Sequence, residues 1–374
     1  MRGNSVTEQS RRQFIQSCLC FTLSGLSPTF VFLCTGCKKN EKSTSLPDVL
    51  EYEKKERLVV ERAAKIDPNY EPAYLKLHRT GELKKRGEEL WNIMESCKLC
   101  PRMCGFNRLA GKKGFCQATS KLFVASYHPH FGEERSLVGR GGSGAIFFSN
   151  CGLRCVFCIN WEISQGGKGK LTSIEELAQM MLSLQKRGCH NINLVTPTHY
   201  SAHILLAVDI AAGKGLRLPL VYNTCGLERL EIIKMLDGII DIYLPDFKYG
   251  DGKMAAKHLS AAATYPEITE QAILEMQRQV GVARPAKDGL MFRGLMIRHL
   301  VMPNRVAGTK EIIEWIAQNL PKDTYFNIMQ QYTPTHKAFE YPEISRRITQ
   351  EEFKEAVRWA KAAGLTNLDI QGWR

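Results

Sequence analysis

Three cysteines in one short loop constrain this 374-residue chain more than any other feature of its sequence. Cys151, Cys155 and Cys158 follow residues 145–149, a run rich in Ile and Phe that is typical of a buried strand. Proteins usually hold a 4Fe–4S cluster with four cysteines, so three thiolates leave one iron open to an external ligand. Zinc sites more often add a second C-x2-C pair or a nearby histidine, and the next histidine after the loop is the distant His190. The array therefore favours a reactive iron–sulfur cluster over zinc or three free thiols.

A second group of cysteines precedes this loop. Cys97, Cys100, Cys104 and Cys116 are spaced as C-x2-C-x3-C-x11-C. Four thiolates suit a structural zinc site and an auxiliary iron–sulfur cluster equally well, and the softness of the ligands does not separate the two. Seven of the thirteen cysteines thus fall into two groups with ligand-like spacing, which favours metal binding over a disulfide framework.

From residue 120 onward, strand-like and helix-like segments alternate. The expected strands cover 145–149, 192–195, 218–222, 239–244, 295–302 and 325–329, and the expected helices cover 173–187, 202–212, 228–236, 269–280, 310–319 and 351–363. This alternation predicts an α/β fold with a parallel sheet and right-handed crossovers. Six strand–helix units are too few to close an eight-stranded barrel. We therefore expect a partial, TIM-like (β/α)6 barrel whose site lies at the carboxyl ends of the strands.

Polar side chains accompany the ends of these expected strands. Thr196 and Thr198 follow the second strand, Asn223 follows the third, Lys248 follows the fourth, and Arg298 lies in the fifth. Because the carboxyl ends of parallel strands meet at one edge of a sheet, we expect these groups to converge on a polar cofactor. The Lys248 ammonium is suited to pairing with the carboxylate of a bound ligand.

The N-terminal third has a different character. Within residues 1–40, the segment Ser10-Arg11-Arg12-Gln13-Phe14-Ile15 is similar to a twin-arginine export signal, and an uncharged stretch then runs to Cys37, a candidate lipidation site. Residues 41–96 are charged and helically periodic, which predicts a helical extension. We expect a four-cysteine metal-binding segment over 97–120 and the partial barrel over 121–374.

The net charge gives little support for nucleic-acid binding. The chain carries 51 Lys and Arg against 38 Asp and Glu, a balance of +13. Residues 1–120 contain 21 basic and 13 acidic side chains, so +8 of that balance lies outside the expected barrel. We expect no nucleic-acid partner, whereas the N-terminal segment suits contact with a membrane or another anionic partner.

Taken together, several motifs resemble the radical S-adenosylmethionine (SAM) superfamily, in particular the subgroup homologous to the pyruvate formate-lyase activating enzyme. The resemblance covers about residues 70–374 and rests on CKLCPRMCGFNR, GSGAIFFSNCGLRCVFC, INLVTPTH, LVYNTCG, DIYLPDFKY and IRHLVMPN. It implies that Cys151, Cys155 and Cys158 ligate a 4Fe–4S cluster whose open iron is chelated by SAM. In that family an electron from the cluster cleaves SAM to a 5′-deoxyadenosyl radical.

The resemblance also implies roles for individual residues around SAM. Phe157 precedes the last cysteine of the loop, Asn223 stands where activating enzymes have an Asp, and Lys248 and Arg298 match a Lys and an Arg of the family's strand ends. The family's Gly-Gly-Glu-Pro segment, which contacts the SAM amino group, is replaced here by the segment from Thr196 to Thr198. This departure weakens the transfer of the activating function itself.

The sequence thus predicts a radical SAM enzyme that abstracts hydrogen from a substrate, with glycyl radical enzyme activation as one version of this activity. The alternative is an exported iron–sulfur electron carrier or binding module on the same scaffold. The enzyme needs a low-potential electron donor, and its substrate is a protein, a peptide or a small molecule. Localisation stays open, because the N-terminus indicates export or anchoring while SAM and such donors are normally cytoplasmic.

Overall fold

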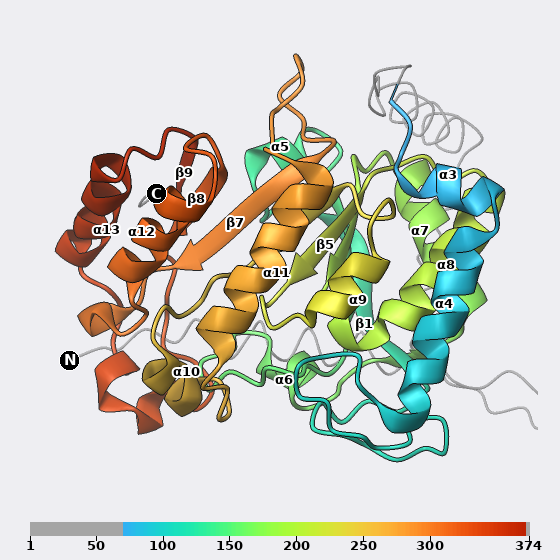
Figure 1. Ribbon diagram of the computed structural model, residues 1–374, viewed down its shortest axis with the longest axis horizontal. Helices are drawn as coiled ribbons and strands as arrows, with labels where there is room; N and C mark the ends of the chain where they lie inside the picture. Colours follow the sequence, from blue (N-terminus) through green and yellow to red (C-terminus); the bar gives the residue numbers. More distant parts are fainter. Residues whose placement is uncertain (1–69, 372–374) are drawn as a thin grey trace, which may run out of the picture. The chain divides into compact units, whose positions relative to one another are not determined.

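In the computed structural model, which describes residues 70–371, nine strands form one open sheet (Figure 1). The strands run in the spatial order β3-β1-β2-β4-β5-β6-β7-β8-β9. Their bounds are Leu122–His130 (β1), Ser143–Phe148 (β2), Lys170–Thr172 (β3), Ile192–Val195 (β4), Leu220–Thr224 (β5), Ile242–Pro245 (β6), Gly294–Leu300 (β7), Tyr325–Met329 (β8) and Leu368–Gln371 (β9). All neighbouring pairs from β2 to β9 are parallel, whereas β1 is antiparallel to both β2 and β3.

Helices connect the parallel strands and cover one face of the sheet. Their bounds are Ile174–Lys186 (α7), Ser201–Gly213 (α8), Leu230–Met235 (α9), Gly252–His258 (α10), Tyr265–Val280 (α11), Thr309–Asn319 (α12) and Gln350–Ala362 (α13). Two of them begin at capping boxes, in which Ser173 pairs with Glu176 and Thr349 pairs with Glu352. These boxes satisfy backbone N–H groups that the first helical turn leaves without partners.

Successive residues along the strands face two separate apolar cores. Leu220, Tyr222 and Ile297 belong to the large cluster that the helices cover. Val221 and Met296 belong to a smaller cluster on the opposite, inner face of the sheet. Since side chains alternate along a strand, Asn223 and Arg298, two residues further on, also lie on the inner face.

The predicted open α/β barrel is confirmed. Each of the six expected strands and six expected helices has a counterpart within a few residues. The sequence did not reveal β1, β3 or β9. The structure therefore adds a seventh parallel strand at one edge and two antiparallel strands at the other.

The helices α3 (Tyr74–Arg79) and α4 (Glu82–Asn92) join the outer helical layer, where α4 packs on α8. Gly87 allows this close approach, because a Cβ there would lie 2.9 Å from Cδ2 of Leu206. The guanidinium of Arg86 donates to the carbonyl oxygens of Met235 and Asp237 and ties α4 to the end of α9. The part of the expected helical extension that the structure describes is therefore helical and packed on the barrel.

The export-like segment 1–40 and residues 41–69 lie outside the described residues. No helix within residues 70–371 combines the length and apolar character that a membrane crossing requires.

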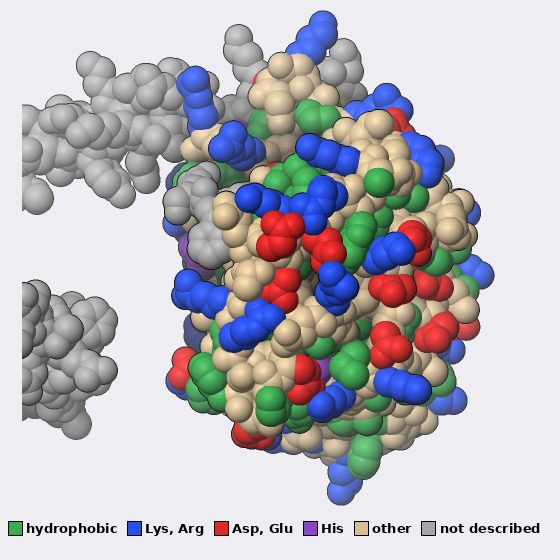
Figure 2. All heavy atoms as spheres, turned by 90° about the vertical axis from the view of Figure 1, so that its left-hand side faces the viewer, with side chains coloured by type: hydrophobic (Ala, Val, Ile, Leu, Met, Phe, Trp, Pro, Cys, Tyr) green, Lys and Arg blue, Asp and Glu red, His purple; other side chains and the backbone are tan. Residues whose placement is uncertain are grey.

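Charges are mixed on the face of the protein that carries α12 and α13. Figure 2 shows basic and acidic side chains interspersed there. Several of them form ion pairs, including Arg305 with Glu355 and Arg346 with Glu352. Positive charge is thus balanced locally on this face.

Candidate active site

The three cysteines of the central loop lie directly beyond the carboxyl end of β2. Two residues of the loop, Asn150 (φ 73°) and Arg154 (φ 53°), adopt the left-handed conformation and turn the chain sharply. The N–H of Val156 donates to the carbonyl of His258, which anchors the loop to the end of α10. Cys151 and Cys155 are buried, and Cys158 is half-buried.

The three thiols are close enough to influence one another electrostatically. Burial raises the pKa of Cys155, the ammonium of Lys248 opposes this, and the thiolates of Cys158 and Cys151 raise it further. Burial also raises the pKa of Cys158, whose Sγ lies 3.2 Å from the Ser164 hydroxyl. A hydrogen bond from the Cys225 thiol, together with backbone N–H groups, lowers the pKa of Cys151. The loop therefore gathers three thiols, and Lys248, which comes from another segment, places a cation beside them.

Lys248 enters this place from the loop after β6. Its Nζ lies 2.7 Å from Oδ2 of Asp246, and its backbone N–H interacts with the hydroxyl oxygen of Tyr265 at 3.0 Å. Burial would lower the pKa of Lys248, but Asp246 and Cys155 outweigh burial and raise it. The side chain thus stays cationic beside the cysteines.

Arg298 and Asn223 meet on the inner face of the sheet. Nη1 of Arg298 lies 3.5 Å from Oδ1 of Asn223, at the limit of a hydrogen bond. The same guanidinium forms an ion pair with Glu134 at 2.6 Å and another with Glu133. Nδ2 of Asn327 donates to Oε1 of Glu134 at 2.7 Å, so the carboxylate is held from two strands. No sequence pattern indicated Glu133 or Glu134 as site residues, since an acidic pair in a loop is usually solvated.

The segment from Thr196 to Thr198 is shaped by backbone and carboxylate contacts. Thr196 has φ 61°, and its N–H donates to the carbonyl of Asn223 at 2.9 Å. The hydroxyl of Thr198 donates to Oε1 of the buried Glu228 at 2.5 Å, and the hydroxyl of Thr224 contacts the same oxygen. Burial raises the pKa of Glu228 to about 7. The Thr198 hydroxyl is thus engaged by protein, and Thr196 presents mainly its backbone.

Comparisons with known proteins fit this arrangement. A family model described as the radical SAM superfamily matches residues 145–270, a range that contains the cysteine loop and Lys248. An uncharacterized protein from Methanocaldococcus jannaschii is 32% identical over 284 residues, which cover 73% of this chain and 77% of that protein.

The chain belongs to the radical SAM superfamily. The family's cofactors are a 4Fe–4S cluster and SAM, and the donor set of the central loop fits such a cluster, because two buried thiols and one half-buried thiol lie together. Within residues 70–371, no group of three or more His, Cys, Asp or Glu side chains is arranged to hold a single metal ion.

In this radical SAM protein, Phe157 anchors the loop by aromatic packing. Its ring centroid lies 6.2 Å from that of Tyr249 and 6.0 Å from that of Tyr332. Tyr249 follows β6 and Tyr332 follows β8, so Phe157 fastens the cysteine loop to two distant strand ends. Phe157 is itself buried, and its contacts in the structure are packing contacts.

The second group of cysteines lies next to the first. The pKa of Cys100 is raised to about 12 by burial, with contributions from Cys116 and Cys97, so these thiols are mutual neighbours. A small cavity of about 10 Å³ is bordered by Cys100 together with Cys151 and Cys225. The segment 97–120 therefore reaches the main cysteine loop, although the family model begins only at residue 145.

Arg102 and Arg108 hold the segment 97–120 in place. Arg102 donates to the carbonyls of Gly152, inside the main loop, and of Leu259. Arg108 is buried and donates to the carbonyl of His199 at 2.8 Å. The contact between the two cysteine groups depends on sequence-distant backbone carbonyls, so the cysteine spacings alone could not reveal it.

Proposed function

We propose that this radical SAM enzyme binds a 4Fe–4S cluster through Cys151, Cys155 and Cys158 and abstracts hydrogen from a substrate. A cluster bound there would supply the electron for reductive cleavage of SAM. The observation that carries the proposal is the grouping of three thiols, two of them buried, beside the Lys248 ammonium. Because a single loop contributes only three ligands, one iron is left for SAM.

The protein's own groups would bind and orient the cofactors. Lys248 is suited to the carboxylate of SAM, because it remains cationic in a buried position. Asn223 lies on the inner face beside Arg298 and offers an amide to the polar parts of SAM. The buried loop and the aromatic contacts of Phe157 keep water away from the thiolates.

We also propose that the scaffold is of the activating-enzyme subgroup. The match at Lys248 and Arg298 supports the scaffold, and Asn223 stands where activating enzymes have an Asp. The replacement of Gly-Gly-Glu-Pro by the segment from Thr196 to Thr198 argues against carrying over the activase reaction itself.

Cys97, Cys100, Cys104 and Cys116 form the second proposed metal site, for zinc or an auxiliary iron–sulfur cluster. Their electrostatic coupling and the contact of Cys100 with the main loop support this proposal. A low-potential electron donor is the partner that the reaction requires.

The test is electron paramagnetic resonance on the full-length, anaerobically reconstituted and dithionite-reduced protein, with and without SAM. We expect a reduced 4Fe–4S signal that changes when SAM is added, and formation of 5′-deoxyadenosine. A reduced cluster that ignores SAM would favour the electron carrier over the enzyme. Zinc without iron and sulfide would refute the cluster altogether.

A further inference from the structure

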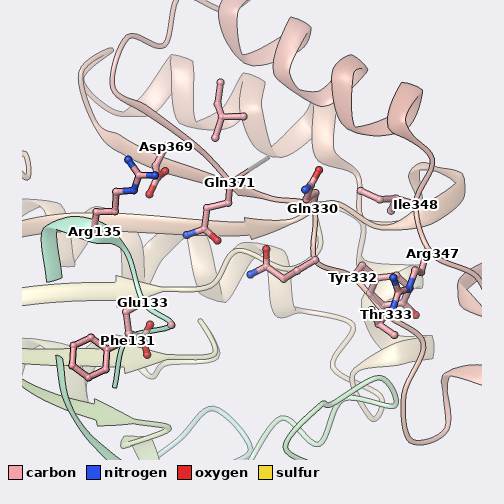
Figure 3. A pocket seen from close by; sticks show the side chains of 13 residues that line it. Phe131, Glu133, Arg135, Gln330, Tyr332, Thr333, Arg347, Ile348, Asp369 and Gln371 are labelled. Atoms are coloured by element: carbon pink, nitrogen blue, oxygen red, sulfur yellow. The ribbon is translucent and has the colours of Figure 1, made fainter. Parts of the chain in front are cut away.

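A large cavity lies between the segment after β1 and the carboxyl ends of β8 and β9. Its volume is about 860 Å³, within the range of about 300–1,000 Å³ that is typical of small-ligand sites. Figure 3 shows that its walls come from the segment after β1, the end of β8, the end of β9 and the segment before α13. The cavity thus lies beside β9, at one edge of the open sheet.

The acidic side chains on the cavity wall have partners within the protein, whereas the basic side chains do not have ion-pair partners among the described residues. Glu133 is paired with Arg298, and Oδ2 of Asp369 accepts a hydrogen bond from the Tyr325 hydroxyl at 2.6 Å. Arg135 and Arg347 have no ion-pair partner within residues 70–371, and Figure 3 places them at opposite sides of the cavity. Arg135 lies beside Asp369 in that view without forming an ion pair. The two exposed guanidinium groups are therefore available to bind anions at the two ends of the cavity.

Amide side chains occupy the space between these cations. Gln330, Gln331 and Gln371 all line the cavity. Figure 3 places Gln330 and Gln371 between the two arginines. A glutamine amide offers both a hydrogen-bond donor and an acceptor, so this part of the wall suits a ligand that carries amide groups.

The cavity is joined to the proposed active site on two sides. Glu133 on its wall pairs with Arg298, which reaches Asn223. Tyr332 on its wall packs edge-on against Phe157 of the cysteine loop. A molecule in the cavity would thus lie against the residues that flank the proposed cluster and SAM.

We propose that this cavity binds the substrate, and that the substrate is an elongated, amide-bearing molecule with an anionic group at each end. An acidic peptide segment and a peptide-like small molecule share this chemistry. Arg135 and Arg347 would bind the anionic ends, and the glutamine amides between them would bind the amide groups of the ligand. This inference rests on the proposed function for its chemistry, but the binding itself requires no turnover.

The test is isothermal titration calorimetry on the full-length, reconstituted protein with SAM but without reductant. The probe is an acetylated Glu-Gly-Gly-Gly-Glu amide, compared with the same peptide carrying Gln at both ends and with the amide-free dicarboxylate sebacate. We expect Arg135→Gln and Arg347→Gln each to weaken the acidic peptide by about tenfold or more, as for loss of one charged hydrogen bond. Arg358→Gln, which removes an exposed charge on α13 outside the cavity, should leave its affinity unchanged.

Equal binding of the Glu-ended and Gln-ended peptides would overturn the proposal, as would equal losses in all three Arg variants. Sebacate binding as tightly as the acidic peptide would overturn the role of the amides. Arg-dependent binding without 5′-deoxyadenosine under reduction would retain the cavity assignment and remove the proposed reaction. SAM cleavage without Arg-dependent binding would retain the proposed reaction and remove the cavity assignment.

Discussion

The guanidinium of Arg298 on β7 forms a buried ion pair with the carboxylate of Glu134, in the segment between β1 and β2. Nε and Nη2 of Arg298 each lie 2.6 Å from an oxygen of Glu134, whose side chain is fully buried. Burial would raise the pKa of Glu134, but Arg298 and the amide of Asn327 outweigh burial and lower it. The pair therefore holds the segment after β1 against the inner face of the sheet.

Replacing Glu134 with Gln should destabilise the fold strongly. The variant leaves the buried Arg298 with Glu133 as its remaining acidic partner, and breaking a buried pair costs about 3 kcal/mol or more. Urea denaturation of the variant and the wild type measures this loss. Glu355→Gln is the control, because its partner Arg305 is exposed and such pairs contribute at most about 1 kcal/mol. Similar losses in both variants would contradict a stabilising role for the buried pair.

Replacing Cys155 with Ala should remove the main cluster and spare the second metal site. Cys155 belongs to the central loop, whereas Cys100 belongs to the second group and borders the same small cavity as Cys151 of that loop. We expect iron content to fall and the SAM-dependent resonance signal to vanish, while metal bound at 97–116 stays. Cys189→Ala is the control, since this buried cysteine belongs to neither group. Simultaneous loss of both metals would mean that the two groups form one site.

The parallel part of the barrel was predictable because it depends on local patterns. Short apolar runs such as 192–195 and 325–329 could be assigned as strands, since amphipathic helices separate them. β9 was missed because its four residues, Leu-Asp-Ile-Gln, lack the continuous apolar character of the buried strands. β3, with only three residues, is too short to show a period.

The site was predictable only where the residues carry their own signal. The spacing of the cysteines and the position of Lys248 after a strand indicated the carboxyl edge of the sheet, where the structure places these residues. The pairing of Arg298 with Glu134 spans 164 positions, and no local pattern encodes such a partner. Cys225 was visible at a strand end, but its contact with Cys151 depends on how β5 and the cysteine loop pack together.

Because of Asp241, the free energy of unfolding should fall as the pH rises from about 4 to about 6. Its carboxylate accepts the N–H groups of Ala73 and Leu220, and burial raises its pKa from 3.8 to about 6. In this window the folded protein keeps a proton that the unfolded chain has released, so the free energy of unfolding falls with rising pH. The full effect is about 3 kcal/mol, and it is complete above the folded pKa.

Chemical denaturation at several pH values checks this slope in the wild type and in Asp241→Asn. The variant cannot ionise, so its stability relative to the wild type should rise between pH 4 and pH 6 and then stay constant. Other buried acids titrate equally in both proteins, and their contributions cancel in the difference. A difference that does not change with pH would show that Asp241 keeps an ordinary pKa in the folded protein.

Thr196→Gly should stabilise the protein while leaving its response to SAM intact. A β-branched residue at φ 61° is strained, and the left-handed conformation costs a non-glycine residue about 1–2 kcal/mol. Glycine relieves this strain, but it loses more backbone entropy on folding, which costs about 0.5–1 kcal/mol. We therefore expect the free energy of unfolding to rise by up to about 1 kcal/mol. Thr196→Val keeps the strain and is the control for loss of the hydroxyl group. Thermal unfolding compares the three proteins, and resonance spectra with SAM report on the site. If Thr196 contributes to SAM binding through its backbone, the glycine variant keeps the SAM-dependent change; a lost response would assign that contribution to the threonine side chain.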